Sequence, residues 1–301
     1  MSNFLLSICI PTFNRADILD DTLNALFSNP DFDSEVIEVI VSDNCSTDNT
    51  GEVVSKYPLV KYYRNEKNVV DFNFSITLSY ASGKYIRLFN DTLSFKPGAL
   101  SKMLKRIELH DGEGKNLFFF PNVFQNVDCK KEIIGIHSFI KECSYFVTWI
   151  AVMGMWREDF DKIENKDEYA LLRFSQLKWM YETVKNGKVS IIYFEEFVDV
   201  TTPNNKGGYN LFETFTLKYL HILKRQKISF AAYEIEKFRL FRNFLYSWLF
   251  QLFINNSYNY AFDTNGVFKI ILKKYWYEPY FYVFYLNFLR RKIMSRKNIN
   301  V

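Results

Sequence analysis

Polar side chains gather at three places in the N-terminal part of the chain, each directly after a short apolar run. Carboxylate and amide oxygens at such places can accept hydrogen bonds from a nucleobase, or hold a divalent cation that bridges phosphates. The same residues also have local uses, since Pro11 could simply end a strand and Asp43 could cap a helix. Together with one residue of an intervening helix, the candidate ligand-binding residues are Pro11, Thr12, Asn14, Asp43, Asn44, Asn73, Asn90 and Asp91.

The hydrophobic pattern predicts the elements that must position these side chains. The predicted strands cover residues 4–10, 36–41, 60–63 and 85–89. The predicted helices cover residues 16–28 with Asn14 as N-cap, 46–54, 71–82 closed by Gly83, and 97–110. Strands that alternate with helices at this spacing predict an α/β fold with a doubly wound, mainly parallel sheet. Ligands bind such sheets at the carboxyl ends of the strands, which is where the polar clusters lie.

Three ordered motifs carry a resemblance to a known family. Residues 7–15 read SICIPTFNR, residues 39–48 read VIVSDNCSTD, and residues 71–74, DFNF, lead to ASGKY at 81–85. This pattern resembles family 2 glycosyltransferases, close to the abequosyltransferase-like enzymes that build bacterial O-antigens and capsules. The resemblance is clear over roughly the first hundred residues, looser to about Phe194 and absent beyond. It implies a GT-A fold, with a Rossmann-like, mainly parallel sheet flanked by helices.

The resemblance also implies an activity. Such an enzyme would transfer a sugar, with inversion, from a nucleotide-diphosphate donor, and a UDP-sugar is the favoured donor. The acceptor would be a saccharide linked to a polyprenyl carrier in surface polysaccharide synthesis. In the donor site, Pro11 and Thr12 would shape the backbone around base and ribose, and Asp43 would accept a hydrogen bond from the base. Asn73 would position the donor or Asp91, unless it is a solvated helix residue.

The metal site is where the sequence departs from this family. The usual pattern is Asp-x-Asp after the fourth strand, whereas this chain reads Asn90-Asp91-Thr92-Leu93. Asp91 takes the first carboxylate position, and Leu93 replaces the second. Because Mg²⁺ can be held by one carboxylate plus substrate phosphates, we expect Asp91 to bind Mg²⁺ or Mn²⁺, with help from Asn90 or Thr92. Transfer without a metal, with Lys or Arg stabilising the diphosphate, is the alternative.

The general base is a second departure. An inverting transfer needs a carboxylate or a histidine that deprotonates the acceptor hydroxyl. Where the family often has Glu-Asp, this chain has Ser175-Gln176. Glu168 and Asp167 are therefore the predicted catalytic residues, although each could equally be a surface charge. Further candidates are Asp159, Asp161 and His137.

The middle third is less regular and predicts strands at 117–120, 133–136 and 189–194 and a helix at 170–185. Residues 201–209 contain Pro203, Gly207 and Gly208 and predict a loop or boundary. We expect a GT-A domain over residues 1–208, with a nucleotide-sugar-binding half at 1–110 and an acceptor half at 111–208. A helical region at 209–301 would follow.

The C-terminal region is aromatic and basic. From Lys218 to Val301 there are 15 Lys and Arg residues and 4 Asp and Glu residues, so the part before it is acidic overall. Aromatic residues and basic clusters together favour contact with an anionic membrane surface. An ordinary helical subdomain or a homo-oligomer interface remains open, whereas nucleic acid is disfavoured because no recognition motif accompanies the charge.

No signal peptide or membrane-spanning segment is expected, and the cysteine spacing predicts neither a zinc site nor disulfides. We therefore expect a cytoplasmic protein, peripheral at the inner face of a bacterial membrane. The lost second Asp and the absent Glu-Asp also leave open a non-catalytic subunit that binds a nucleotide-sugar and scaffolds a polysaccharide assembly complex.

Overall fold

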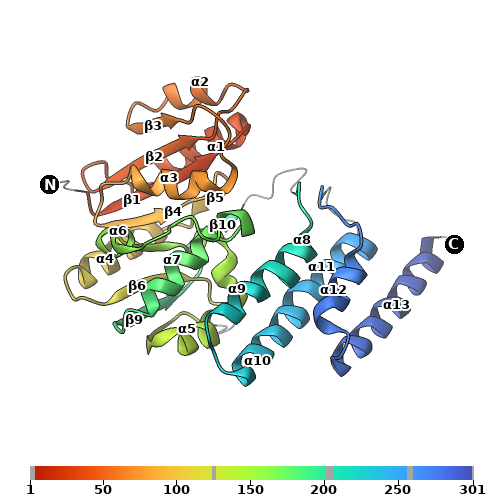
Figure 1. Cartoon of the computed structure of the whole chain (residues 1–301). Coiled ribbons are helices and arrows are strands. Elements are labelled where there is room, and N and C mark those ends of the chain that lie inside the picture. The colour runs from red at the N-terminus through yellow and green to blue at the C-terminus, as the bar shows by residue number, and fades with distance from the viewer. Residues whose placement is uncertain (1–3, 124–126, 201–206, 256–259, 300–301) are drawn as a thin grey trace. The chain divides into compact units, whose positions relative to one another are not determined.

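The computed structural model describes residues 4–123, 127–200, 207–255 and 260–299. The chain forms two compact units, residues 1–201 and 202–301 (Figure 1). The division lies seven residues before the boundary that the sequence pattern places at residue 208. Each unit is described by itself below.

The first unit is built on a five-stranded sheet with the order β3-β2-β1-β4-β8. The first four strands are parallel, and β8 pairs antiparallel with β4, which confirms the predicted mainly parallel sheet. Every residue of β2 and β4 is buried, as expected for a parallel sheet covered on both faces. The strands are β1 (Leu6–Thr12), β2 (Ile37–Asp43), β3 (Val60–Arg64), β4 (Tyr85–Leu88) and β8 (Gly154–Trp156).

The strand register brings the predicted ligand-binding residues to one edge. Thr12, the last residue of β1, is paired with Asp43, the last residue of β2. On the other side of β1, Cys9 is paired with Leu88, so the chain leaves β4 toward the same edge with Asn90 following closely. Polar clusters that are far apart in the sequence therefore meet at the carboxyl ends of β1, β2 and β4.

Two smaller sheets complete the first unit. A three-stranded sheet has the order β6-β9-β7, with β6 parallel and β7 antiparallel to β9. A two-stranded antiparallel ribbon pairs β5 with β10. These strands are β5 (Leu93–Phe95), β6 (Asn116–Phe120), β7 (Cys129–Ile134), β9 (Val189–Phe194) and β10 (Val198–Val200).

Helices of the first unit connect these strands, and most bury one apolar face. In α1, for example, Leu19, Leu23 and Leu26 are buried at helical spacing. The α-helices are α1 (Ala16–Phe27), α2 (Thr50–Ser55), α3 (Asn73–Ser79), α4 (Ala99–His110), α5 (Gly135–Cys143), α6 (Arg157–Lys162) and α7 (Ser175–Val184). Short 3₁₀ turns are η1 (Val70–Phe72), η2 (Ser144–Thr148), η3 (Ile150–Val152) and η4 (Ala170–Leu172).

The helix predicted at 71–82 ends early, because the chain before β4 binds a buried carboxylate. The backbone N–H groups of Ser82 and Gly83 both donate to Oε1 of Glu38, at 2.5 and 2.9 Å. Gly83 does not close the helix: it lies so close to β1 that a Cβ there would be 2.6 Å from Oγ of Ser7. The glycine is needed for close approach to β1 rather than for a left-handed helix end.

Two other predicted elements also differ in their bounds. The strand expected at 133–136 ends at Ile134, because Gly135 has φ of +76° and begins α5. The helix expected at 170–185 is divided, because Arg173 takes the left-handed conformation with φ of +69° between η4 and α7. The reversal at Arg173 matters for the site described below.

The second unit is helical over its described residues, as the aromatic and basic pattern predicts. Its helices contain π-helical segments, in which the hydrogen bonds span one residue more than in an α-helix. The elements are α8 (Leu211–Glu213), η5 (Thr214–Tyr219), α9 (Leu220–Arg225), α10 (Phe230–Leu240), η6 (Phe241–Leu245), α11 (Tyr246–Phe250), η7 (Gln251–Asn255), α12 (Val267–Tyr275) and α13 (Pro279–Ile299). In the part of the chain that the structure describes, none of the helices has the length and hydropathy needed to cross a bilayer.

Candidate functional site

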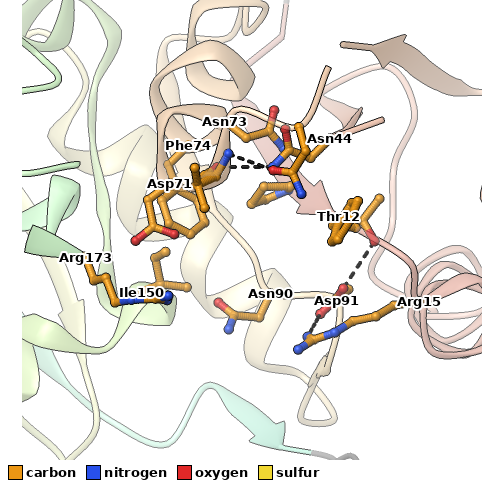
Figure 2. Close-up of a pocket in the computed structure, with 14 residues that line it drawn as sticks. Thr12, Arg15, Asn44, Asp71, Asn73, Phe74, Asn90, Asp91, Ile150 and Arg173 are labelled. Carbon is orange, nitrogen blue, oxygen red and sulfur yellow. Dashed lines mark hydrogen bonds and ion pairs between the residues drawn. The ribbon is translucent and has the colours of Figure 1, made fainter. Parts of the chain in front are cut away.

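A cavity of about 360 Å³ opens where β1, β2 and β4 end, on the edge where the sequence predicts ligand binding (Figure 2). Its volume lies in the range of small-molecule sites. Six of the eight predicted binding residues line it. These six residues are Pro11, Thr12, Asn44, Asn73, Asn90 and Asp91.

Asp91 is the buried carboxylate of this cavity, with only 3% of its surface exposed. Oγ1 of Thr12 donates to Oδ2 of Asp91 at 3.2 Å, and Nη1 of Arg15 donates to Oδ1 at 2.9 Å. Burial raises the pKa of Asp91, whereas the charge and hydrogen bonds of Arg15 and Thr12 oppose that rise. The carboxylate is thus held in an environment that favours a nearby cation.

Three charged residues of the cavity were not among the predicted site residues. They are Arg15, Asp71 and Arg173, and Figure 2 shows Asp71 and Arg173 on one side and Arg15 and Asp91 on the other, with Asn90 between them. Two of them had a signal in the sequence, because Arg15 ends the first motif and Asp71 begins the third. Arg173 had none, because only the folding of the middle third brings it to the cavity.

Asn90 lies beside Asp91 and has an unsatisfied side-chain oxygen. Its Oδ1 is buried and has no hydrogen-bond donor among the described residues. An amide oxygen in that state is costly unless a ligand or water satisfies it. Because Asn90 lines the cavity, a bound donor or cation is the kind of partner that could satisfy this atom.

Asn73 joins α3 to the end of β2. Its Oδ1 accepts from Oγ of Ser42 at 2.7 Å and from Nδ2 of Asn65 at 2.8 Å, and its Nδ2 donates to the Ser42 carbonyl at 2.9 Å. The side chain is 3% exposed, so Asn73 is a buried, fully engaged residue rather than a solvated helix residue. These contacts fix the wall of the cavity and do not include Asp91.

Asn44 organises the loop that precedes η1. Its Oδ1 accepts from the backbone N–H of Val69 at 2.8 Å, and its Nδ2 donates to Oδ1 of Asn68 at 2.9 Å and to the Val70 carbonyl at 3.2 Å. Val70 has φ of +52°, which is strained for a β-branched residue. Its side chain is 59% exposed although it lines the cavity. The amide contacts of Asn44 therefore hold an apolar side chain at the cavity wall at a cost in backbone strain.

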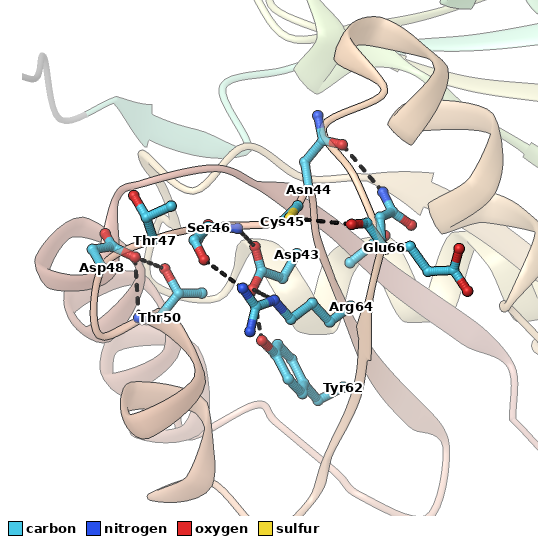
Figure 3. A network of polar contacts seen from close by, with 12 residues as sticks. Asp43, Asn44, Cys45, Ser46, Thr47, Asp48, Thr50, Tyr62, Arg64 and Glu66 are labelled. Atoms are coloured by element: carbon cyan, nitrogen blue, oxygen red, sulfur yellow. Dashed lines mark hydrogen bonds and ion pairs between the residues drawn. The ribbon is translucent and has the colours of Figure 1, made fainter.

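Asp43 lies outside the set of residues that line the cavity, and its carboxylate binds neighbouring groups (Figure 3). It accepts from the Ser46 N–H at 2.8 Å and from the Tyr62 hydroxyl at 2.7 Å, and Nε of Arg64 is 3.6 Å away. The side chain is 2% exposed. Burial, followed by the contact with Asp43, raises the pKa of the Tyr62 hydroxyl, so Tyr62 is a donor at neutral pH. A base-binding role for Asp43 stays a prediction.

Asn14 does not cap α1, so this part of the prediction was wrong. Its backbone has φ of +50°, and its side-chain Oδ1 accepts from the Thr47 N–H at 2.7 Å. The first N–H group of α1, that of Ala16, instead donates to Oδ2 of Asp48 at 2.9 Å. The loops that follow β1 and β2 thus bind each other, and the second loop caps α1, which local sequence rules cannot foresee. Asn14 is exposed and lies outside the residues that line the cavity of Figure 2.

The two predicted catalytic carboxylates also lie outside the cavity lining. Asp167 accepts from Oγ of Ser75, on α3, at 2.5 Å. Glu168 forms an ion pair with Nζ of Lys178 at 2.8 Å, and about a quarter of its side chain, 26%, is exposed. Among the described residues, the carboxylates that line the cavity are Asp71 and Asp91. The assignment of a general base stays a prediction.

The residues that line the cavity could hold a divalent cation only with few protein ligands. In the described part of the chain, no group of three or more His, Cys, Asp or Glu side chains is placed to hold a metal ion. Leu93 is buried on β5, so it leaves the position of a second carboxylate apolar. Asp91 and the free Oδ1 of Asn90 suit a cation that takes most of its ligands from substrate phosphates and water.

Comparison with known proteins matches part of the chain to a known family. Residues 7–116 match the sequence profile of glycosyl transferase family 2. An abequosyltransferase of Salmonella typhimurium is 38% identical over 92 residues, which are 28% of this chain and 27% of that protein. A GalNAc(5)-diNAcBac-PP-undecaprenol beta-1,3-glucosyltransferase of Campylobacter jejuni is 32% identical over 133 residues, 42% of this chain and 39% of that protein. The chain thus spans well under half the length of either relative.

Solved structures show the same fold. The crystal structure of residues 1–349 of TarS from S. aureus has a TM-score of 0.58 at 17% identity and covers 83% of this chain and 75% of that one. The same protein in complex with UDP-GlcNAc has a TM-score of 0.56 at 19% identity and covers 97% and 81%. Residues 7–116 are thus similar to glycosyl transferase family 2, and the first unit of this chain has the GT-A fold.

Proposed function

We propose that this protein transfers a sugar from a nucleotide-diphosphate donor, with a UDP-sugar as the favoured donor, to a polyprenyl-linked saccharide in bacterial surface polysaccharide synthesis. The family match and the names of the relatives support sugar transfer. The name of the Campylobacter relative specifies an undecaprenol-linked acceptor, and TarS has been crystallised with UDP-GlcNAc. Both features are extended to this chain as part of the proposal.

The observation that carries the proposal is the environment of Asp91. A carboxylate that is 3% exposed at a strand end, with a raised pKa and a guanidinium at 2.9 Å, is arranged to meet further positive charge. The free Oδ1 of Asn90 lies in the same cavity. Perturbed carboxylates in clefts are typical of functional sites, and this one follows the strand at which the family binds its donor diphosphate.

Charge at the donor diphosphate would be balanced from two directions. Arg15 and Arg173 present guanidinium groups to the cavity, and guanidinium groups bind phosphate oxygens well. Asp91 and Asn90 would hold Mg²⁺ or Mn²⁺, which would neutralise the leaving nucleoside diphosphate. Asn44 and Asn73 keep the cavity wall in place through their amide contacts.

Inversion requires a base on the acceptor side. Glu168 and Asp167 are the residues predicted for this role, and the contact of Asp167 with Ser75 places it next to α3, which also carries Asn73. Asp71 lies in the cavity itself and is a third carboxylate to test. The acceptor hydroxyl would lose its proton to one of these groups as it attacks the anomeric carbon.

A non-catalytic scaffold that binds a nucleotide-sugar is the second candidate. The observation in its favour is that Arg15 already forms an ion pair with Asp91, while Leu93 is buried where a second carboxylate would lie. Both candidates bind the donor, and turnover separates them.

The deciding experiment measures release of nucleoside diphosphate from UDP-, GDP-, dTDP- and CDP-sugars with Mg²⁺, Mn²⁺ or EDTA, alongside calorimetric binding of the nucleotides. The variant is Asp91→Asn, and the matched control is Asp17→Asn, which changes an exposed carboxylate on α1. Release from one donor that D91N loses and D17N keeps supports the enzyme. Binding without release in the presence of membrane extract supports the scaffold, and absence of any nucleotide binding contradicts both.

For the second unit, we propose contact with the inner face of the cell membrane through residues 209–301. In this proposal α12, α13 and the turn between them lie against the membrane. Large side chains there are exposed, including Trp276 at 62%, Val283 at 68% and Leu286 at 66%. Arg290, Arg291 and Lys292 follow on α13. Exposed aromatic and aliphatic groups next to basic clusters suit the interface of an anionic bilayer. A homo-oligomer interface is the competing use of this surface.

A further inference from the structure

Arg87 is a buried arginine without a carboxylate partner. It lies on β4, three residues before Asn90, and is 2% exposed. Its Nη2 donates to the carbonyl of Ala151, whereas Nε and Nη1 have no acceptor among the described residues. Burial lowers the pKa of the guanidinium to about 10, so Arg87 is still charged at neutral pH. A buried, unpaired charge costs free energy unless an anion or strong acceptor meets it.

Arg87 lines a second cavity of about 320 Å³ in the first unit, apart from the cavity that holds Asp91. The turn η3 contributes to both cavities, since Ile150 lines the first and Ala151 the second. Aromatic rings form much of the wall of the second cavity. They are Phe119, Phe120, Phe146, Trp149 and Phe197.

The acidic residues of this cavity are already paired with other bases. Glu195 binds Arg106, and Glu196 binds Lys96, which also lies 3.7 Å from Asp199. The segments 124–126 and 201–206, which adjoin cavity residues in the chain, contain no Asp or Glu in their sequence. The described part of the chain therefore offers no carboxylate to Arg87.

We propose that this cavity is a second ligand site, which binds the carboxylate or phosphate of a monosaccharide-sized ligand to Arg87. An arginine donates strong, charge-assisted hydrogen bonds to either group. The aromatic walls suit the apolar face of a sugar ring, and the volume is at the lower end of that of small-molecule sites. The proposal does not depend on sugar transfer, because binding at Arg87 can be measured without turnover.

The test is titration of the full chain with D-glucuronate, D-glucose 6-phosphate and neutral D-glucose, followed by calorimetry and by tryptophan fluorescence. Trp149 lines the cavity and serves as the reporter, with Trp149→Phe to assign the signal. We expect at least one anionic sugar to bind tenfold or more tightly than glucose, and Arg87→Gln to abolish that difference. Preference for glucuronate identifies a carboxylate ligand, and preference for glucose 6-phosphate identifies a phosphate ligand.

Two controls separate this site from the donor cavity. Saturating UDP should leave binding of the anionic sugar unchanged, and so should Arg15→Gln, because Arg15 lines only the other cavity of the two. Displacement by UDP, equal affinity for glucose, no saturable binding of either anionic sugar, or unchanged binding in R87Q would overturn the proposal. If R87Q does not fold, the comparison of the charged and neutral sugars on the unaltered chain decides.

Discussion

Arg15 places Nη1 2.9 Å from Oδ1 of Asp91, so the carboxylate expected to meet a metal ion already has a cation beside it. The two residues come from different parts of the fold, one after β1 and the other after β4. The side chain of Arg15 is 44% exposed and that of Asp91 is 4% exposed. Because Arg15 is half-exposed, its guanidinium can leave Asp91 for a phosphate oxygen more easily than the buried carboxylate can move. The site can therefore receive a diphosphate without a second acidic residue.

The raised pKa of Asp91 predicts a pH dependence of stability. An acid with a pKa that is higher in the folded state binds more protons when folded, so its contribution to the free energy of unfolding falls as pH rises. This fall begins near the unfolded pKa of about 4 and ends above the raised native pKa. We expect the free energy of unfolding of the unaltered chain, minus that of the Asp91→Asn variant, to decrease between these two pKa values.

Urea unfolding of both proteins at a series of pH values measures this difference. Subtracting the D91N values removes the contributions of the other carboxylates. A difference that stays flat, or that rises with pH, would contradict the assigned environment of Asp91.

The general base can be identified with three isosteric variants, Asp71→Asn, Asp167→Asn and Glu168→Gln. Removal of a general base lowers kcat by roughly 10² to 10⁴, whereas loss of a binding contact mainly raises KM. We expect either D167N or E168Q to show the loss in kcat. If only D71N shows it, the base lies in the cavity wall; steady-state kinetics with the identified donor and acceptor measures both constants.

Val70 stores backbone strain that glycine should release. Because φ is +52° and the side chain is 59% exposed, Val70→Gly removes the strain without opening the core. The strain is about 1–3 kcal/mol and the entropic cost of glycine about 0.5–1 kcal/mol, so we expect V70G to be more stable by about 1 kcal/mol.

The matched control is Val69→Gly, at a residue with φ of −101°, which should be destabilised. If Val70 also contacts the donor, V70G should bind UDP less tightly despite its higher stability. A thermal shift with the same sign in both variants would argue against strain at Val70.

Gly83 and Gly51 should respond to alanine in opposite ways. A Cβ at Gly83 would lie 2.6 Å from Oγ of Ser7 and 2.9 Å from its backbone nitrogen, so G83A should cost about 1–3 kcal/mol. At Gly51, on α2, a Cβ would meet only the Tyr62 hydroxyl at 3.5 Å, and alanine should stabilise the helix by up to about 1 kcal/mol. Chemical denaturation of the two variants measures both signs, and equal effects would contradict the packing described here.

Membrane contact predicts a response from Trp276 and the basic cluster of α13. With vesicles containing anionic lipid, we expect a blue shift of tryptophan emission that Trp276→Ala reduces. Neutralising Arg290, Arg291 and Lys292 to Gln should weaken binding more than tenfold, since each basic residue contributes about 1 kcal/mol at an anionic surface.

The control neutralises Lys218, Lys224 and Lys227, which lie earlier in the same unit. Co-sedimentation at low and high salt separates the two triple variants. Absence of binding at low salt, together with a concentration-dependent increase in mass, would assign this surface to self-association instead.

The sequence by itself determined the alternation of strands and helices and the edge at which polar residues gather. Those features follow from local patterns, because buried strands and amphipathic helices have characteristic periods and ligands bind parallel sheets where the strands end. The three motifs and the family resemblance identified Pro11, Thr12, Asn44, Asn73, Asn90 and Asp91, all of which line the cavity.

The tertiary structure decided which charges meet. Arg15 pairs with Asp91, Asp48 caps α1, and Arg173 reaches the cavity of Asp91, and each of these contacts joins segments that are distant in the sequence. The fold also leaves Arg87 buried without a carboxylate partner among the described residues. Local propensity does not encode such contacts, because they depend on strand register and on loops that follow different strands. For the same reason, the sequence could not distinguish Asp167 and Glu168 from carboxylates that line the site. In the folded chain neither residue lines the cavity.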